Sequence, residues 1–172
     1  ARMTAQTPTR LADYAPPAFL VETVDLTFRL APRGTRVRAR LRLRPNPEAR
    51  PDQDLWLDGR ALRLVSAAID GEGLSPNEME ITEEGRRVPA ARLPGGGFEW
   101  LCETEIDPQD NAALEGLYMS GGMFCTQCEA EGFRKITYFP DRPDVMAVFT
   151  VRIEGEAPVM LSNGNPAESG PG

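Results

Sequence analysis

The sequence has 172 residues, of which 41% are hydrophobic and 26% are charged, and these values are those of one ordinary folded domain. Its formal net charge of −7 opposes non-specific binding to nucleic acid or to an anionic membrane surface. The chain contains no histidine, which excludes histidine-based metal sites and catalysis by Ser-His-Asp or Cys-His groups.

The sequence lacks signals for export and for membrane insertion. No run of about 18 apolar residues occurs, and the first stretch, ARMTAQTPTR, has no apolar segment like that of a signal peptide. The three cysteines form an odd set, which favours reduced thiols over a disulfide framework. We therefore expect a cytoplasmic protein with a single domain over residues 1–172, in which 1–12 and 164–172 are flexible or linker segments.

The first clear element is a hairpin. In TVDLTFRL, residues 23–30, apolar and polar side chains alternate at period two, which predicts a half-buried strand. The turn-forming APRGTR follows, and VRARLRLR, residues 37–44, repeats the alternation. The arginines of this second stretch share one face opposite Glu22 and Asp25, so we interpret them as a solvated outer face rather than a basic binding stripe.

Short apolar stretches then recur about every ten residues, broken by turn signals, as is typical of a β-sandwich or an open antiparallel sheet. These stretches are LWLDG, LRLVSAAIDG, MEITEEG and RRVPAARLP. The segment GGGFEWLCETEID adds a further strand, with Phe98 and either Trp100 or Leu101 facing inward. We expect Cys102 to be a small buried residue of this strand.

Helical signals are weak throughout the sequence. The best candidate is PDVMAVF, residues 143–149, in which Pro143 suits the first turn and the apolar residues fall at helical spacing. Asp141 and Asp144 are available to cap this short helix. The fold class predicted from these patterns is all-β, an antiparallel β-sheet or sandwich with one short helix.

The segment CTQCEAEGFR, residues 125–134, contains two cysteines at the spacing of metal ligands or redox pairs. A structural zinc site needs four ligands, and with Cys102 as the only other cysteine and no histidine the set is one ligand short. The acidic residues after Cys128 would raise a thiol pKa, whereas redox chemistry requires a lowered one. A zinc-stabilised adaptor that uses these cysteines is a weaker hypothesis.

The same segment carries Gln127, Glu129 and Glu131 at alternate positions, which would share one face on an extended chain. Charged residues mostly lie on the surface without further meaning. Here glycines and large apolar residues surround them, which favours a cleft wall that would bind a cation such as an ammonium group. These neighbours are Gly121, Gly122, Gly132, Phe124, Phe133, Ile136, Tyr138 and Phe139.

The run NAALEGLYMSGGMFCTQCEAEGFRKITYFPDRPDVMAVFTVRI, residues 111–153, strongly resembles the N-terminal domain of the bacterial aminopeptidase N family, which are gluzincin zinc metallo-aminopeptidases. LSNGN and, more loosely, DYAPPAFLVETVDLTF extend the likeness over most of the chain. The resemblance implies a saddle-shaped antiparallel β domain that precedes a thermolysin-like catalytic domain. That domain carries HExxH and Gly-x-Met-Glu-Asn motifs in the family, and this sequence has neither, so no catalytic or metal-binding residue is expected here.

The resemblance also implies roles for two residues. Glu129 matches the family glutamate that binds the free α-ammonium of the substrate, and Gln127 matches the glutamine beside the pocket for the first side chain. An α-amino group with a pKa of about 8 is largely cationic at neutral pH, so a fixed carboxylate would select it and set its distance to the scissile bond. The resemblance leaves Cys125 and Cys128 without a role, and we interpret them as packing or incidental thiols.

The implied partners are the catalytic domain of the same parent chain, which would hold the zinc, and the N-terminus of a peptide; alone, the chain should be inactive. Arg134 could pair with Glu131 or Asp141 to hold the loop in shape. Apolar residues near Phe124 and Tyr138 should be exposed where the catalytic domain would cover them, so the chain would self-associate. The alternative hypothesis is a stand-alone β-sandwich module that binds amines or peptide N-termini without catalysis.

Overall fold

The structure is a computed structural model that describes residues 11–170. Residues 1–10 and 171–172 lie outside the described residues. Most of the first and the end of the second segment that were expected to be flexible or linker, 1–12 and 164–172, fall there. The described chain forms eleven strands and five single-turn 3-10 helices. The strands are β1 Phe19–Arg29, β2 Thr35–Pro45, β3 Leu55–Asp58, β4 Arg63–Ile69, β5 Glu72–Gly73, β6 Glu80–Ile81, β7 Gly85–Val88, β8 Phe98–Ile106, β9 Gly116–Ser120, β10 Met123–Gln127 and β11 Val148–Glu154. The 3-10 helices are η1 Leu11–Asp13, η2 Pro76–Glu78, η3 Ala90–Arg92, η4 Pro108–Asp110 and η5 Phe133–Lys135.

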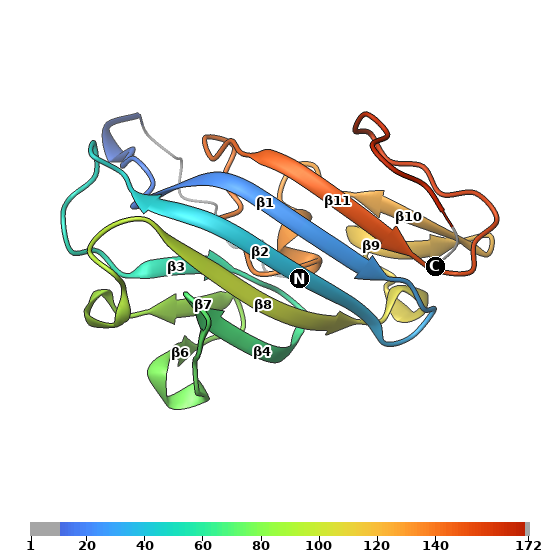
Figure 1. Cartoon of the computed structure of the whole chain (residues 1–172), viewed down its shortest axis with the longest axis horizontal. Coiled ribbons are helices and arrows are strands. Elements are labelled where there is room, and N and C mark those ends of the chain that lie inside the picture. Colours follow the sequence, from blue (N-terminus) through green and yellow to red (C-terminus); the bar gives the residue numbers. More distant parts are fainter. Residues whose placement is uncertain (1–10, 171–172) are drawn as a thin grey trace, which may run out of the picture.

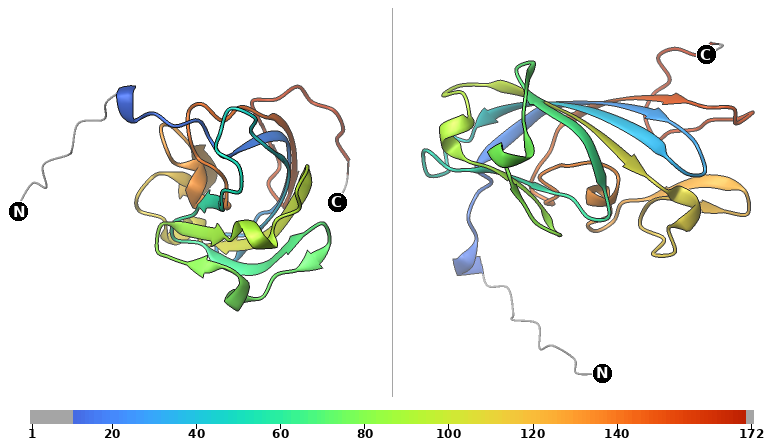
Figure 2. Two further views of the ribbon diagram at one scale, coloured as in Figure 1. Left: turned by 90° about the vertical axis from the view of Figure 1, so that its left-hand side faces the viewer. Right: turned by 90° about the horizontal axis from the view of Figure 1, so that it is seen from below.

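One large sheet organises the domain, with the strand order β11-β1-β2-β8-β4-β5 (Figure 1). Adjacent strands of this sheet run antiparallel, except that β1 and β11 run parallel to each other. A second sheet has the order β3-β7-β6, and β9 and β10 form a separate hairpin. Figure 2 shows the large sheet curving around the smaller elements. The prediction of an all-β fold is confirmed.

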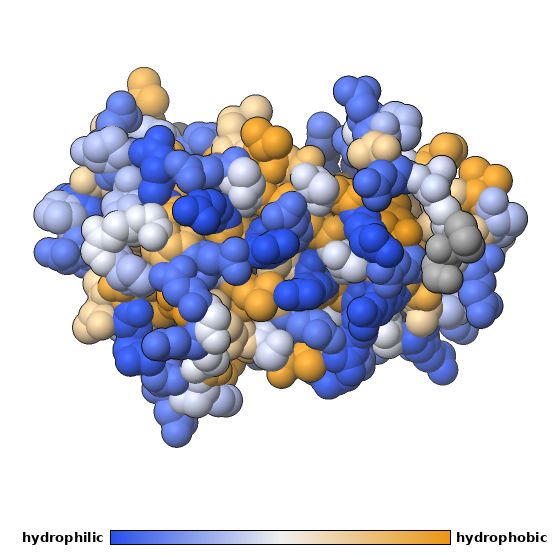
Figure 3. Space-filling view, viewed as in Figure 1, coloured by the Kyte–Doolittle hydropathy of each residue, from blue (hydrophilic) through white to orange (hydrophobic). Residues whose placement is uncertain are grey.

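The predicted hairpin is formed by β1 and β2. The inward side chains lie opposite one another in register, for example Val24 with Leu41, and both are completely buried. The arginines of β2 point outward, and Arg36, Arg40, Arg42 and Arg44 pair with acids of the neighbouring strands. Arg40 lies 3.6 Å from Asp25, and Arg36 lies 2.7 Å from Glu103. Figure 3 shows hydrophilic side chains over this face, so the interpretation of the arginine row as a solvated surface is correct.

The core of the domain is centred on β8. Phe98, Trp100 and Cys102 are buried, whereas Leu101 is half-buried on the other face, so Trp100 is the inward residue. Cys102 lies in register between an alanine of β2 and an alanine of β4, and these small residues leave room for the tryptophan beside it. Cys102 is a buried free cysteine, as predicted.

The expected helix over residues 143–149 is wrong. The chain makes a turn, in which the Val145 N–H donates to the Arg142 carbonyl at 3.1 Å, and then enters β11 at Val148. β11 pairs with β1 along its whole length. The free edge of β1 offers backbone hydrogen bonds to the extended chain, and β-branched and aromatic residues suit a strand better than a short helix.

The two aspartates expected to cap that helix have other partners. The Asp144 carboxylate pairs with Arg142 at 2.7 Å and accepts a hydrogen bond from the Tyr14 hydroxyl at 2.9 Å. Asp141 accepts hydrogen bonds from Arg134 instead. Both aspartates therefore hold loops together, because no helix N-terminus is present at this point of the chain.

The apolar exposure expected near Phe124 is present at the adjacent Met123, which is 66% exposed, whereas the exposure expected near Tyr138 is wrong. Tyr138 is buried, with Gly59 so close beneath its ring that a Cβ on Gly59 would collide with it. The Arg86 guanidinium lies over the same ring, 4.9 Å from its centre. Large apolar side chains are exposed instead along β11 and on the segments before and after it. They are Met146, Val148, Phe149, Val151, Val159, Met160 and Leu161.

Candidate functional site

The segment that carries Gln127, Glu129 and Glu131 is only partly extended. β10 ends at Gln127, and the chain then makes a tight turn in which the Gly132 N–H donates to the Cys128 carbonyl at 2.8 Å. The peptide bond between Glu129 and Ala130 is cis. All three polar side chains are exposed, but they do not share one strand face, because Glu129 and Glu131 lie in the turn.

Two glycines permit this turn. A Cβ on Gly132 would collide with the backbone carbonyl oxygen of Gln127 and would lie 3.2 Å from the backbone nitrogen of Gly116. Gly116 has a positive φ of 71°, and a Cβ there would lie 2.8 Å from the Cβ of Lys135. The first residue of β9 thus packs directly against the turn and against η5. These close contacts restrict the backbone conformations that the turn can take.

Arg134, at the centre of η5, connects the turn to the chain that follows it. Its Nε donates to the Asp141 carboxylate at 3.0 Å and its Nη2 donates to the Asp141 carbonyl at 2.9 Å. Its Nη1 also lies 3.4 Å from the Glu131 carboxylate. Sequence reasoning left Glu131 and Asp141 as alternative partners of Arg134, and the structure has both contacts. A supporting role for the three residues at the site stays a prediction.

Two further residues of this region were missed by sequence reasoning. Asp58, the last residue of β3, accepts a hydrogen bond from the backbone N–H of Asp141 at 2.9 Å. Trp56 donates its indole N–H to the same Asp58 carboxylate at 3.0 Å. The stretch LWLDG indicates only that Trp56 and Asp58 share the outward face of a strand. It contains no signal for a partner so distant in the chain.

The electrostatics differ between Arg134 and Glu129. Burial acts to lower the pKa of the Arg134 guanidinium, but the hydrogen bond with Asp141 and the charges of Asp58, Asp141 and Glu131 outweigh it and raise the pKa above its ordinary value. Arg134 therefore stays charged. Among residues 11–170, no basic side chain lies within ion-pair distance of the Glu129 carboxylate. Glu129 is therefore available to an external cation.

The cysteines of this segment are half-buried free thiols. Burial raises the pKa of the Cys128 thiol, and the negative charge of Asp141 adds to this effect. A raised pKa opposes the thiolate form that redox catalysis and metal binding require. Within the described part of the chain, no group of three or more His, Cys, Asp or Glu side chains is placed to hold a metal ion.

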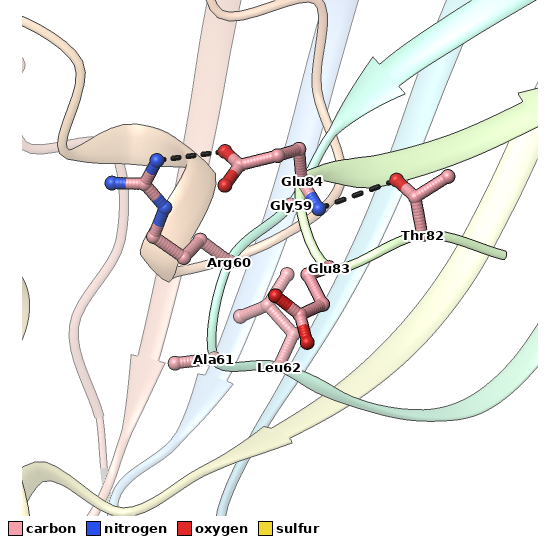
Figure 4. Close-up of a pocket in the computed structure, with 7 residues that line it drawn as sticks. All are labelled: Gly59, Arg60, Ala61, Leu62, Thr82, Glu83 and Glu84. Carbon is pink, nitrogen blue, oxygen red and sulfur yellow. Dashed lines mark hydrogen bonds and ion pairs between the residues drawn. The ribbon is translucent and has the colours of Figure 1, made fainter. Parts of the chain in front are cut away.

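The structure has two shallow hollows among its described residues, and neither is lined by residues of this segment. The first, of about 410 Å³, is lined by residues 59–62 and 82–84 (Figure 4). At its rim the Arg60 guanidinium donates to the Glu84 carboxylate at 2.7 Å. The second is lined by residues 52–54 with Trp56 and Arg87. Neither hollow includes Gln127 or Glu129, so neither hollow is the cleft whose wall these two residues were expected to form.

None of the helices in the described residues is long and apolar enough to span a membrane.

Comparison with known proteins relates this geometry to a family. Residues 95–171 match the family model described as the Peptidase M1 N-terminal domain. The chain is 53% identical over 162 residues to aminopeptidase N of Caulobacter vibrioides and 44% identical over 161 residues to that of Escherichia coli. These matches cover 93% and 92% of this chain but only 18% of each relative. The chain thus spans about a fifth of the length of these curated relatives.

Solved structures agree with the sequence matches. The aminopeptidase A of Legionella pneumophila, solved in complex with aspartic acid, superposes with a TM-score of 0.76 and 32% identity, over 84% of this chain and 17% of that one. An M1 zinc metallopeptidase of Deinococcus radiodurans, with a TM-score of 0.65 at 19% identity over 81% of this chain and 33% of that one, has the same fold. Together with the matched family model and the curated relatives, this likeness shows that the chain is similar to the peptidase M1 N-terminal domain over residues 95–171 and to part of the aminopeptidases N over almost its whole length.

Proposed function

We propose that this chain is the N-terminal β domain of a zinc aminopeptidase, an enzyme that releases N-terminal amino acids from peptides. In this proposal Glu129 binds the α-ammonium group of the substrate and Gln127 lines part of the pocket for the first side chain. One observation supports it above the others. An exposed carboxylate without an ion-pair partner among the described residues stands on a tightly packed turn, in a chain 53% identical to an aminopeptidase N.

The chemistry of Glu129 follows from charge and distance. The α-amino group of a peptide has a pKa of about 7.7 to 8, so it is largely protonated at neutral pH. A carboxylate forms short, charge-assisted hydrogen bonds with such a cation. Because Gly116 and Gly132 restrict the turn, the carboxylate would hold the peptide N-terminus at a constant distance from the bond to be cleaved. An acylated N-terminus would lack the required charge.

The zinc of the proposed enzyme does not fit this chain. The sequence has no histidine, and the described residues contain no cluster of metal ligands. We therefore assign the metal to the part of the longer enzyme that would form the catalytic domain, the proposed partner of this one. There it would activate water and polarise the scissile carbonyl. The 172 residues by themselves should be inactive on aminoacyl amides, and the cytoplasmic location expected from the sequence is part of the same proposal.

The test compares the complete protein that contains this chain with its Glu129→Ala variant on an aminoacyl p-nitroanilide, with kcat and KM measured separately. We expect kcat/KM to fall by about 100-fold, which corresponds to about 2.7 kcal/mol of lost transition-state stabilisation, with the zinc content unchanged. Glu72→Ala is the matched control, because Glu72 is exposed on β5, which forms the edge of the large sheet opposite β11.

An unchanged kcat/KM in the Glu129→Ala enzyme would contradict the assigned role and leave only the fold in common with the family. If the complete protein cleaves no aminoacyl amide, while the 172-residue chain binds peptides with free N-termini, the stand-alone binding module would be the better description. Both measurements use the same purified proteins, so the two hypotheses are separated in one series.

A further inference from the structure

Residues 58–60 and residues 134–141 are joined at several points although they are distant in the chain. Asp58 and Phe139 exchange two backbone hydrogen bonds, of 2.8 Å and 3.1 Å, as an isolated antiparallel bridge. The Arg60 N–H donates to the Arg134 carbonyl at 2.9 Å. The end of β3 therefore holds both ends of this segment, which directly follows the turn that carries Glu129.

The Asp58 side chain strengthens this junction. One carboxylate oxygen accepts the backbone N–H of Asp141 at 2.9 Å, and the other accepts the indole N–H of Trp56 at 3.0 Å. The Arg134 Nη1 lies 4.0 Å from Asp58. A carboxylate with both oxygens engaged has one orientation, so Asp58 acts as a rigid support for the segment.

The group is nearly closed to solvent and rich in negative charge. The side chains of Asp141, Arg134 and Asp58 are only 12%, 13% and 17% exposed. A single guanidinium therefore faces two nearly buried carboxylates, and it also reaches the Glu131 carboxylate, which is 65% exposed. A nearly buried ion pair is sensitive to the loss of one member, since the remaining charge keeps its desolvation cost without its compensation.

The contacts continue to the turn itself. Asp58 orients Asp141, Asp141 holds the guanidinium of Arg134, and Arg134 contacts Glu131. Glu131 lies two residues after Glu129 in the same turn, which the hydrogen bond between Gly132 and Cys128 closes. Loss of Asp58 would leave the Asp141 N–H without its acceptor and would let Arg134 change its position, which would move Glu131 and the turn with it.

We propose that Asp58 is a positioning residue for Glu129: through Asp141 and Arg134 it sets the place of the turn, and thereby the affinity of the site for the α-ammonium group. This inference rests on the proposed function of Glu129. It goes further in assigning control of amine recognition to a residue of β3 that does not touch the substrate. The chemistry of the bond cleavage is left to the rest of the enzyme.

The experiment is a double-mutant cycle in the complete enzyme, with Asp58→Asn, Glu129→Ala and the double variant. Asparagine has nearly the same shape as aspartate, but it lacks the charge that faces Arg134 and one of the two acceptor oxygens. Each variant is assayed for kcat and KM and for inhibition by two hydroxamates that differ only in an α-amino group. Glu84→Ala is the matched control, because it removes an exposed ion pair with Arg60 from the same corner of the fold.

We expect Asp58→Asn to lower kcat/KM by about tenfold, mainly through a raised KM, because a small displacement of a positioning group is costly. Inhibition by the amino hydroxamate should weaken by a similar factor, whereas inhibition by the hydroxamate without the amine should not change. In the Glu129→Ala background, Asp58→Asn should cause no further loss. Trp56→Phe, which removes the donor to Asp58 together with part of the ring that faces Arg87, should give a smaller loss with the same dependence on the amine.

The inference is wrong if Asp58→Asn weakens both hydroxamates equally, if its effect adds fully to that of Glu129→Ala, or if it has no effect. Failure of the proposed function has a different signature, because Glu129→Ala alone would then leave kcat/KM and both inhibition constants unchanged. Thermal unfolding of every variant separates a general loss of stability from a change in recognition, since a loss of folded enzyme lowers kcat without altering the ratio of the two inhibition constants.

Discussion

At the scale of single residues, the turn at 128–132 depends on the absence of a side chain at one position. Gly132 has a negative φ of −87°, so its backbone conformation is open to any residue. The restriction comes from space, because a Cβ would collide with the carbonyl of Gln127. Glu129 is exposed and contacts no described basic residue, yet its location depends in part on the packing of this glycine.

Gly132→Ala should therefore destabilise the domain and impair the site together. We expect the free energy of unfolding to fall by about 1 to 3 kcal/mol, because the backbone around Gln127 must move to admit the methyl group. Urea unfolding followed by circular dichroism measures this change. Gly96→Ala is the control, since no atom lies within 4 Å of a Cβ at that position. Equal stabilities for the two variants would contradict the argument.

At the scale of elements, β11 begins inside the segment 143–149 that was expected to be a helix. It forms the edge of the large sheet and is parallel to β1. Its first five residues are exposed, including Val148, Phe149 and Val151. β11 therefore pairs with the edge of β1, while its own outer edge has no neighbouring strand in the large sheet. An apolar edge strand with unpaired backbone groups is a surface that pairs with other chains.

The 172-residue chain expressed by itself should consequently self-associate, and Val148→Lys should reduce this association. Val148 is 69% exposed at the start of the edge strand, where a lysine charge opposes pairing with a second copy. Sedimentation velocity over a range of protein concentrations measures the effect. Leu114→Lys is the control, at a leucine 56% exposed in the loop before β9, outside any strand. A chain that stays monomeric at all concentrations would refute the prediction.

At the scale of the whole molecule, ion pairs cover much of the outer surface and depress the pKa of several carboxyls. Hydrogen bonding to Arg63 lowers the pKa of Glu105, and hydrogen bonding to Arg152 lowers that of Glu154. Hydrogen bonding to Arg142 likewise lowers the pKa of Asp144. A carboxyl with a lowered pKa in the folded state stabilises the fold at neutral pH, and this contribution is lost as the pH falls through the folded pKa.

Stability to urea should accordingly be constant near neutral pH and should decline as the pH falls below the ordinary glutamate and aspartate pKa values of 4.5 and 3.8. Added salt should lessen this decline in stability with falling pH, because these groups are exposed and their interactions are screened. Glu105→Gln should show a smaller decline than the unmodified protein, whereas the exposed Glu72→Gln should match it. A urea midpoint independent of pH over this interval would contradict the prediction.

The candidate site was predictable only where local sequence carried the information. Gln127 and Glu129 were singled out by their motif and its resemblance to a family, and Arg134 offered two possible acidic partners nearby. Asp58 could not be found in this way. Its contacts with Phe139 and Asp141 join segments about 80 residues apart, and a strand that ends in LWLDG has no pattern that identifies such a partner.

The sequence by itself determined the all-β class, the hairpin of β1 and β2 and the likeness to peptidase M1 N-terminal domains, because alternation and motifs are local and survive without knowledge of neighbours. Only the tertiary structure decided that residues 143–147 form a turn and loop rather than a helix, that Trp100 and not Leu101 faces inward, that Glu129 stands on a turn, and that Asp58 contacts Arg134 and Asp141. Those features depend on a free sheet edge, on the space beside a glycine and on charges brought together by folding, none of which is encoded at one place in the chain.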